Sequence, residues 1–139
     1  MKMQRDVATR LGARIAGWKV GFGPDGAPFA GPLYEDVVVR SPATRRLAPG
    51  NYVLVEVELA FRLARDLPSR ETPRQAIVDA IDEAIAGIEL IRGRLGEPPA
   101  VPFLAFLADN AGNDGYVTGA ATRDFRKLDL PALRCRLAV

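Results

Sequence analysis

Two glutamates two positions apart, Glu56 and Glu58, have the spacing of a chemical site. They lie in a stretch where apolar residues occupy every second position, which is typical of a β-strand with one buried face. Both side chains then project from the other face, with Cα atoms about 6.5–7 Å apart. Two carboxylates at that distance can converge on one cation. The competing interpretation is a solvated polar face, because most glutamates are simply exposed.

A third acid, Glu89, lies inside the short apolar segment 88–91. Burying an unpaired carboxylate is costly, so Glu89 needs either a cation or an ion-pair partner. Arg92 and Arg94 are the partners that the sequence suggests. Three glutamates on two strands would make a compact site with oxygen ligands only, which favours Mg²⁺, Mn²⁺ or Ca²⁺.

The residue counts exclude several other kinds of active site. The 139 residues include no histidine and one cysteine, Cys135, which we expect in the core. A Ser-His-Asp triad, a Cys-His pair, a zinc site of thiolates or imidazoles and an internal disulfide are therefore impossible. A general base must be a carboxylate, a lysine, a tyrosine or a metal-bound hydroxide. Lys19 lies between glycines in the segment 17–21 (GWKVG), either in close contact with backbone or as an ordinary exposed strand residue.

The charge pattern and hydropathy indicate the class of partner. The net charge is +2, and no run of basic residues is interleaved with aromatic ones, so we expect no nucleic-acid binding. No apolar run reaches 18 residues, so we expect no membrane span. The N-terminus lacks the apolar region of a secretory signal, and we expect a cytoplasmic protein.

The helices and strands that must position these residues are short. Their mixture predicts one α/β or α+β domain over residues 1–139. In the helix expected over 73–86, Thr72 is the expected N-cap and Gly87 is the expected end. The C-terminal strand has no partner, which predicts a domain incomplete at both ends and prone to self-association. We expect helices over 4–14, 73–86 and 103–108, strands over 16–22, 34–40, 52–64, 88–92, 116–118 and 133–139, loops over 27–33, 97–102 and 109–115, and turns at 24–26 and 49–50.

Five motifs in order make the sequence similar to a known family. They are GWKVG (17–21), GPLYED (31–36), VEVELAF (55–61), GIELI (87–91) and LADNA (107–111). Together they resemble the 2-keto-4-pentenoate hydratase / 4-oxalocrotonate decarboxylase branch of the fumarylacetoacetate hydrolase superfamily. The resemblance implies a partial mixed β-roll with few helices. The sequence departs from the family in two respects. It is shorter, and it has GNDG at residues 112–115, where relatives often have a serine.

The resemblance also implies roles for particular residues. Mg²⁺ or Mn²⁺ would be held by Glu56, Glu58 and Glu89, and Lys19 would stabilise enolate charge or move protons. Asp36, and less so Glu35, would assist catalysis. Leu59, Asp109 and Asn110 would contact the substrate.

The implied function is a metal-dependent hydratase, a lyase of aromatic meta-cleavage catabolism. It would add water to a small 2-hydroxy-2,4-dienoate or 2-oxo-4-enoate, and the implied assembly is a homo-oligomer. The alternatives within the family are a 2-oxo acid decarboxylase and an acylpyruvate hydrolase. The alternative from another class is a truncated remnant without catalytic activity.

Overall fold

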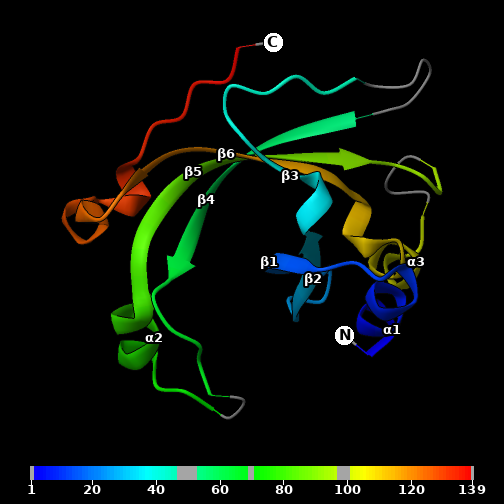
Figure 1. The fold of residues 1–139 in the computed structure, drawn as a ribbon, viewed down its shortest axis with the longest axis horizontal. Coiled ribbons are helices and arrows are strands. Elements are labelled where there is room, and N and C mark those ends of the chain that lie inside the picture. The colour runs from blue at the N-terminus through cyan, green and yellow to red at the C-terminus, as the bar shows by residue number, and fades with distance from the viewer. Residues whose placement is uncertain (1, 47–52, 69–70, 97–100, 139) are drawn as a thin grey trace.

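The computed structural model describes residues 2–46, 53–68, 71–96 and 101–138 (Figure 1). Among them it is a mixed α/β structure, as predicted. The elements in chain order are α1 (Lys2–Leu11), β1 (Ile15–Phe22), β2 (Pro28–Tyr34), η1 (Glu35–Val37), β3 (Val38–Arg40), β4 (Val53–Leu63), α2 (Arg74–Ala80), β5 (Ile81–Arg92), α3 (Phe103–Ala108), η2 (Asn110–Gly112), β6 (Asn113–Thr122), η3 (Asp124–Lys127) and η4 (Leu130–Ala132).

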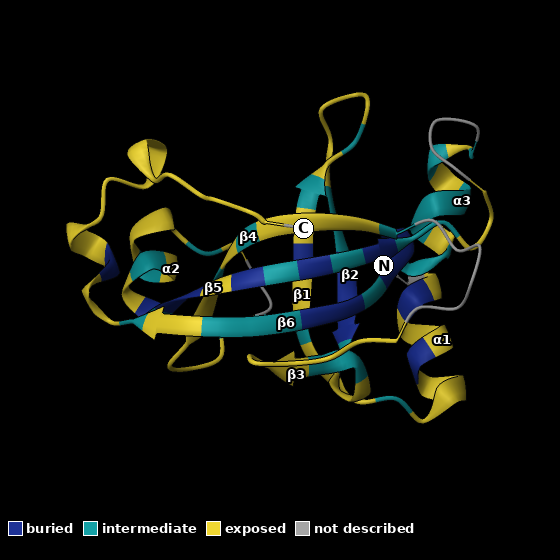
Figure 2. Cartoon of the chain, turned by 90° about the horizontal axis from the view of Figure 1, so that it is seen from above, coloured by how far each residue is buried: buried dark blue, intermediate teal, exposed yellow. Residues whose placement is uncertain are grey.

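The strands form two sheets. The larger sheet has the order β3-β6-β5-β4, in which β5 is antiparallel to both neighbours and β3 is parallel to β6. The antiparallel hairpin β1–β2 crosses one face of this sheet (Figures 1 and 2). We call the face toward the hairpin the inner face and the opposite one the outer face. Buried residues gather on β5 and β6 (Figure 2).

Several predictions of local structure are confirmed. The strands expected over 16–22 and 52–64 are β1 and β4, and the helix expected over 103–108 is α3. The N-terminal helix begins earlier than expected and ends at Leu11. Gly12 then adopts a φ of 62°, which a glycine reaches without strain. The turn at 24–26 closes the hairpin, with the Gly23 N–H donating to the Ala27 carbonyl at 2.8 Å.

The loop predicted over 27–33 is wrong, because these residues form most of β2. Two prolines argued against a strand, since proline cannot donate to a sheet ladder. In a two-stranded sheet, however, every strand is an edge strand, and edges tolerate proline. Pro28 begins β2, and Pro32 lies opposite Trp18 of β1.

The helix predicted over 73–86 is also wrong in its second half. Helix α2 ends at Ala80, and β5 runs from Ile81 to Arg92, so Gly87 lies within a strand. Pro73, rather than Thr72, takes the N-cap position. Pairing with β4 on one side and β6 on the other outweighs the helical spacing of the apolar residues.

The structure corrects four further predictions. The strand expected over 34–40 is reduced to β3, preceded by η1, and Val39 of β3 is exposed. The loop expected over 109–115 holds η2 and the start of the ten-residue β6. Residues 133–138 form no strand, and Cys135 is exposed. The turn at 49–50 and residues 97–100 of the loop at 97–102 lie outside the described residues.

The outer face of the sheet differs most from the sequence prediction. The alternating apolar residues of β4 were expected to be fully buried. Instead, these side chains from Val55 to Leu63 remain 36–42% exposed.

No helix among the described residues is long and apolar enough to cross a membrane.

Candidate metal centre

The three predicted metal ligands come together on the inner face. Glu56 of β4 lies directly opposite Glu89 of β5, and Glu58 lies opposite Gly87. One carboxylate oxygen from each glutamate lies within 4.8 Å of the others. The period-2 pattern therefore predicted the shared face of Glu56 and Glu58 correctly, and antiparallel pairing adds Glu89 to it.

Glu89 is fully buried, and its two oxygens have different surroundings. The Lys19 Nζ donates to Oε1 at 2.6 Å, and the Asn113 Nδ2 donates to the same oxygen at 2.8 Å (Asn113 is on β6). The other oxygen, Oε2, has no hydrogen-bond partner among the described residues. A buried carboxylate oxygen without a partner is costly, so Oε2 is suited to bind a cation.

Lys19, not Arg92 or Arg94, is the ion-pair partner of Glu89. Lys19 is itself 8% exposed, so its interpretation as an ordinary surface lysine is wrong. Its ammonium also donates to the Ala111 carbonyl at 3.3 Å. Gly31 faces Lys19 in the hairpin, and a Cβ there would lie 3.2 Å from the Lys19 Cγ, so a glycine gives the lysine stem room.

The electrostatics of the cluster also fit a divalent cation. Burial raises the pKa of Glu58, and the negative charge of Glu89 raises it further, while Lys19 opposes the shift. Like charges this close disfavour joint ionisation unless a cation compensates them. The donor set consists of oxygens only, which Mg²⁺ and Ca²⁺ prefer. These residues therefore fit a divalent metal ion.

Sequence reasoning missed Tyr116 of β6, which lies opposite Glu89 and is buried. Its side chain hydrogen-bonds with that of Glu58. Burial and the Glu58 charge raise the pKa of Tyr116, so the phenol stays protonated and donates. A Cβ on Gly87 would collide with the Tyr116 hydroxyl. A glycine inside a strand can mark such a close approach, which is the signal that could have pointed to this residue.

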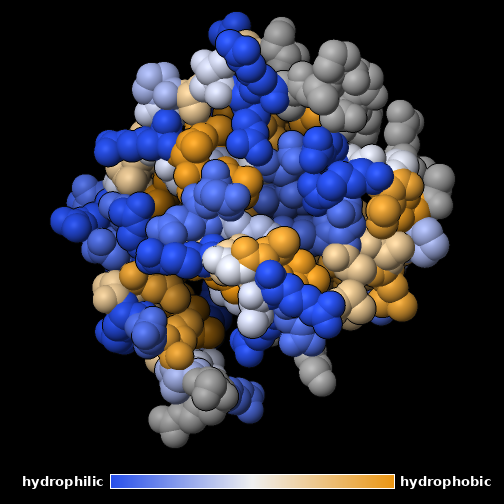
Figure 3. All heavy atoms as spheres, turned by 45° about the vertical axis from the view of Figure 1, so that its right-hand side comes forward, coloured by the Kyte–Doolittle hydropathy of each residue, from blue (hydrophilic) through white to orange (hydrophobic). Residues whose placement is uncertain are grey.

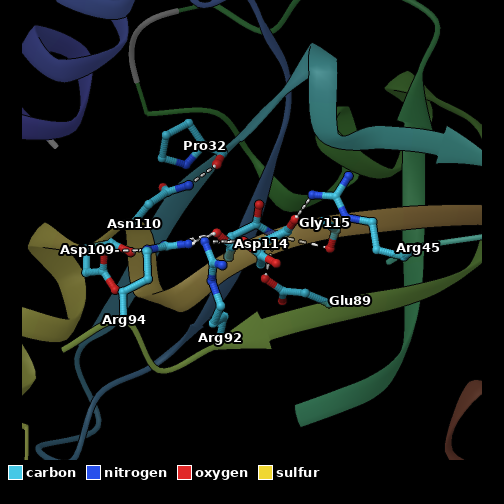
Figure 4. A network of polar contacts seen from close by, with 10 residues as sticks. Pro32, Arg45, Glu89, Arg92, Arg94, Asp109, Asn110, Asp114 and Gly115 are labelled. Carbon is cyan, nitrogen blue, oxygen red and sulfur yellow. Dashed lines mark hydrogen bonds and ion pairs between the residues drawn. The ribbon is translucent and has the colours of Figure 1, made fainter. Parts of the chain in front are cut away.

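The loop predicted to border the substrate lies beside the cluster. The Asn110 Nδ2 donates to the Pro32 carbonyl at 2.9 Å, while its Oδ1 is buried without a partner among the described residues (Figure 4). Asp109 pairs with Arg94 at 2.7 Å. Asn110 and Ala111 both have positive φ values, of 56° and 50°, and the Ala111 carbonyl contacts Lys19.

The structure does not bring the other predicted site residues into the cluster. Leu59 alternates with Glu58 on β4, so it belongs to the outer face. Glu35 is exposed and pairs with Arg14 at 3.1 Å. Asp36 is exposed on η1, where its charge adds to the effect of burial in raising the pKa of Tyr34.

Comparison with known proteins shows what the chain is similar to. No family model matches the sequence. Curated 2-keto-4-pentenoate hydratases from Paraburkholderia xenovorans (strain LB400) and Pseudomonas putida are each 30% identical to the chain over 129 residues. The match covers 86% of this chain and 47% of each relative. The resemblance to this branch of the fumarylacetoacetate hydrolase superfamily is confirmed.

A solved structure supports the same fold. The 4-oxalocrotonate decarboxylase of Pseudomonas putida G7, complexed with magnesium and adipate, matches with a TM-score of 0.69 at 21% identity. The match covers 91% of this chain and 51% of that one. The same decarboxylase has also been solved with calcium and acetate. The chain thus spans about half the length of the relatives it matches.

Proposed function

We propose that the chain is a divalent-metal-dependent lyase that adds water to a 2-hydroxy-2,4-dienoate or its 2-oxo-4-enoate form. The observation that carries this proposal is the convergence of Glu56, Glu58 and Glu89 within 4.8 Å, with Lys19 bound to Glu89. The names of the curated relatives support the hydratase reaction. We expect Mg²⁺ or Mn²⁺ in the site.

The metal, when bound, supplies a Lewis acid that polarises the 2-oxo group and stabilises negative charge. The chain's own residues hold and surround the substrate. Lys19 is fixed by Glu89 and the Ala111 carbonyl, so its positive charge is held at the site without reorganisation. The protonated Tyr116 hydroxyl holds Glu58. The unpartnered Asn110 Oδ1 can accept a hydrogen bond from a substrate hydroxyl.

The remaining residue assignments stay predictions. Asp36, with Glu35 as the weaker choice, is the predicted helper in proton transfer. Leu59, Asp109 and Asn110 are the predicted substrate contacts. Of these, Asn110 is supported by its buried, unpartnered oxygen.

The second candidate reaction is decarboxylation of a 2-oxo acid, which the solved structural neighbour favours. In both reactions, the bound metal would stabilise the negative charge that develops on the 2-oxo group. Release of carbon dioxide from 4-oxalocrotonate would support the decarboxylase, and loss of the dienoate absorbance without carbon dioxide release would support the hydratase.

We also propose that the chain acts as a homo-oligomer in the cytoplasm. Apolar side chains on the outer face of β4 are 36–42% exposed, and self-association would cover them. Apolar patches also reach the surface in Figure 3. The exposed free thiol of Cys135 suits a reducing compartment.

The test is Mn²⁺ binding by calorimetry, with and without oxalate as an enolate mimic. We expect saturable binding that oxalate tightens. Glu56→Gln should weaken Mn²⁺ binding at least about tenfold, because it removes a charged ligand. The matched control is Glu83→Gln on β5, whose carboxylate pairs with Arg62 outside the cluster and should keep the original affinity. Equal affinity in both variants would contradict the metal site.

A further inference from the structure

We propose that a β-bulge at Asp114 makes Asn113 a positioning residue that presents the Oε2 of Glu89 to the metal. This inference rests on the proposed metal site and adds a residue that the family resemblance did not supply. Asn113 acts through Glu89 and is not itself a proposed ligand.

The bulge is visible in the pairing of β5 with β6. Leu90 pairs with Gly115, but the next residue, Ile91, pairs with Asn113, so Asp114 is the extra residue. Without the bulge, Asn113 and Tyr116 would face opposite sides of the sheet, because they are three residues apart. The extra residue changes the alternation and puts both side chains on the inner face with Glu89.

The consequence is two donors on one oxygen. Asn113 is 5% exposed, and its Nδ2 lies 2.8 Å from the Glu89 Oε1 that also accepts from Lys19. The carboxylate cannot rotate without breaking both bonds. Its Oε2 is therefore held in the direction in which it has no protein partner.

Three arginines hold the bulge in place (Figure 4). The Asp114 carboxylate pairs with Arg92 at 3.1 Å and with Arg94 at 3.4 Å. Arg94 also donates to the Asn113 carbonyl at 3.0 Å, and Arg45 donates to the Asp114 carbonyl. The side chain and the backbone of the bulge are thus fixed from several sides, which is the support that a positioning residue needs.

The test compares Mn²⁺ affinity by calorimetry in Asn113→Leu, Asn113→Gln and the unaltered chain. Asn113→Leu removes the donor at similar volume and should weaken Mn²⁺ binding about 10–100-fold, as is typical when a group supporting a ligand is lost. Asn113→Gln keeps an amide donor and should recover part of that affinity. A purely structural role predicts no such rescue.

Asp114→Asn provides a second variant should Asn113→Leu fail to fold. It leaves Asn113 in place and removes the charge held by Arg92 and Arg94, so its loss of affinity should be smaller but measurable. An unaltered chain that binds Mn²⁺ no more tightly than Asn113→Leu and Asp114→Asn would overturn the positioning role alone. An unaltered chain that does not bind Mn²⁺ would overturn the proposed function as well.

Discussion

The two faces of the four-stranded sheet differ in how completely this chain covers them. On the inner face, Glu89 and Tyr116 are 0% and 3% exposed beneath the β1–β2 hairpin and η2. On the outer face, Val57 and Leu59 are 41% and 38% exposed, although their spacing is that of core residues. On the central strands β5 and β6, the polar face is therefore better buried than the apolar residues of β4 on the other face.

This difference separates the site from the rest of the fold. Over β5 and β6 the inner face is covered by elements that the chain itself contains, so the geometry of Glu89 is set by contacts such as that with Lys19, while Glu56 on the edge strand β4 is exposed. On the outer face, Phe125 of η3 packs against Phe61 with ring centroids 5.8 Å apart, but Val57 and Leu59 remain 41% and 38% exposed. We therefore expect substitutions on the inner face to alter both stability and metal binding, and those on the outer face to alter association.

Lys19→Met should have the largest effect, because it leaves the Glu89 carboxylate buried without its ion-pair partner. Breaking a buried pair by removing one partner typically costs about 3–5 kcal/mol of the free energy of unfolding. Urea denaturation of the metal-free chain measures this loss. The double variant Lys19→Met/Glu89→Gln should regain part of it, since no unpaired charge remains.

The matched control for this prediction is Lys127→Met. The Lys127 Nζ lies 2.7 Å from the Asp124 Oδ1, almost the distance in the Lys19–Glu89 pair, but both side chains are mostly exposed. Solvent screens such a pair, so the free energy of unfolding should hardly change. Similar losses in both lysine variants would show that the Lys19–Glu89 pair is no better shielded from solvent than the Lys127–Asp124 pair.

Gly87→Ala should have the next largest effect. The added methyl group would collide with the Tyr116 hydroxyl, so Tyr116 must move and its bond to Glu58 is disturbed. Overpacking of this kind costs about 1–3 kcal/mol, and Mn²⁺ affinity should fall with it. The control is Gly115→Ala on β6, where the new methyl meets only Leu90 and Arg45 atoms at 3.6–3.7 Å. Equal Mn²⁺ affinity in both alanine variants would contradict this role of Gly87.

Sequence patterns predicted the site best where a single strand determines it. The strict alternation in β4 fixed the common face of Glu56 and Glu58 without knowledge of any partner. The strand character of residues 81–86 could not be predicted in this way. Ile77, Ile81 and Ile85 lie four residues apart, as in a helix, and only pairing with β4 and β6 decides for a strand.

Contacts between distant segments were beyond the local pattern. Lys19 and Glu89 are 70 residues apart, and the sequence suggested nearby arginines for the acid instead. The bulge at Asp114 depends on how β6 aligns with β5, so the placement of Asn113 beside Glu89 had no local signal. The residue pattern and the family resemblance both pointed to the three glutamates, but neither pointed to Asn113, which donates to Glu89.

Val57→Ser should have the smallest effect on folding and tests the outer face directly. The Val57 side chain is already 41% exposed, so exposing it further should cost about 1 kcal/mol of the free energy of unfolding, less than full burial of a valine contributes. Its effect on association should be larger, because a polar group at the centre of an apolar interface weakens it. Sedimentation velocity should show a shift toward the monomer, while Mn²⁺ affinity stays unchanged. A fall in Mn²⁺ affinity would mean that the two faces are coupled, and unchanged sedimentation would mean that self-association does not use this face.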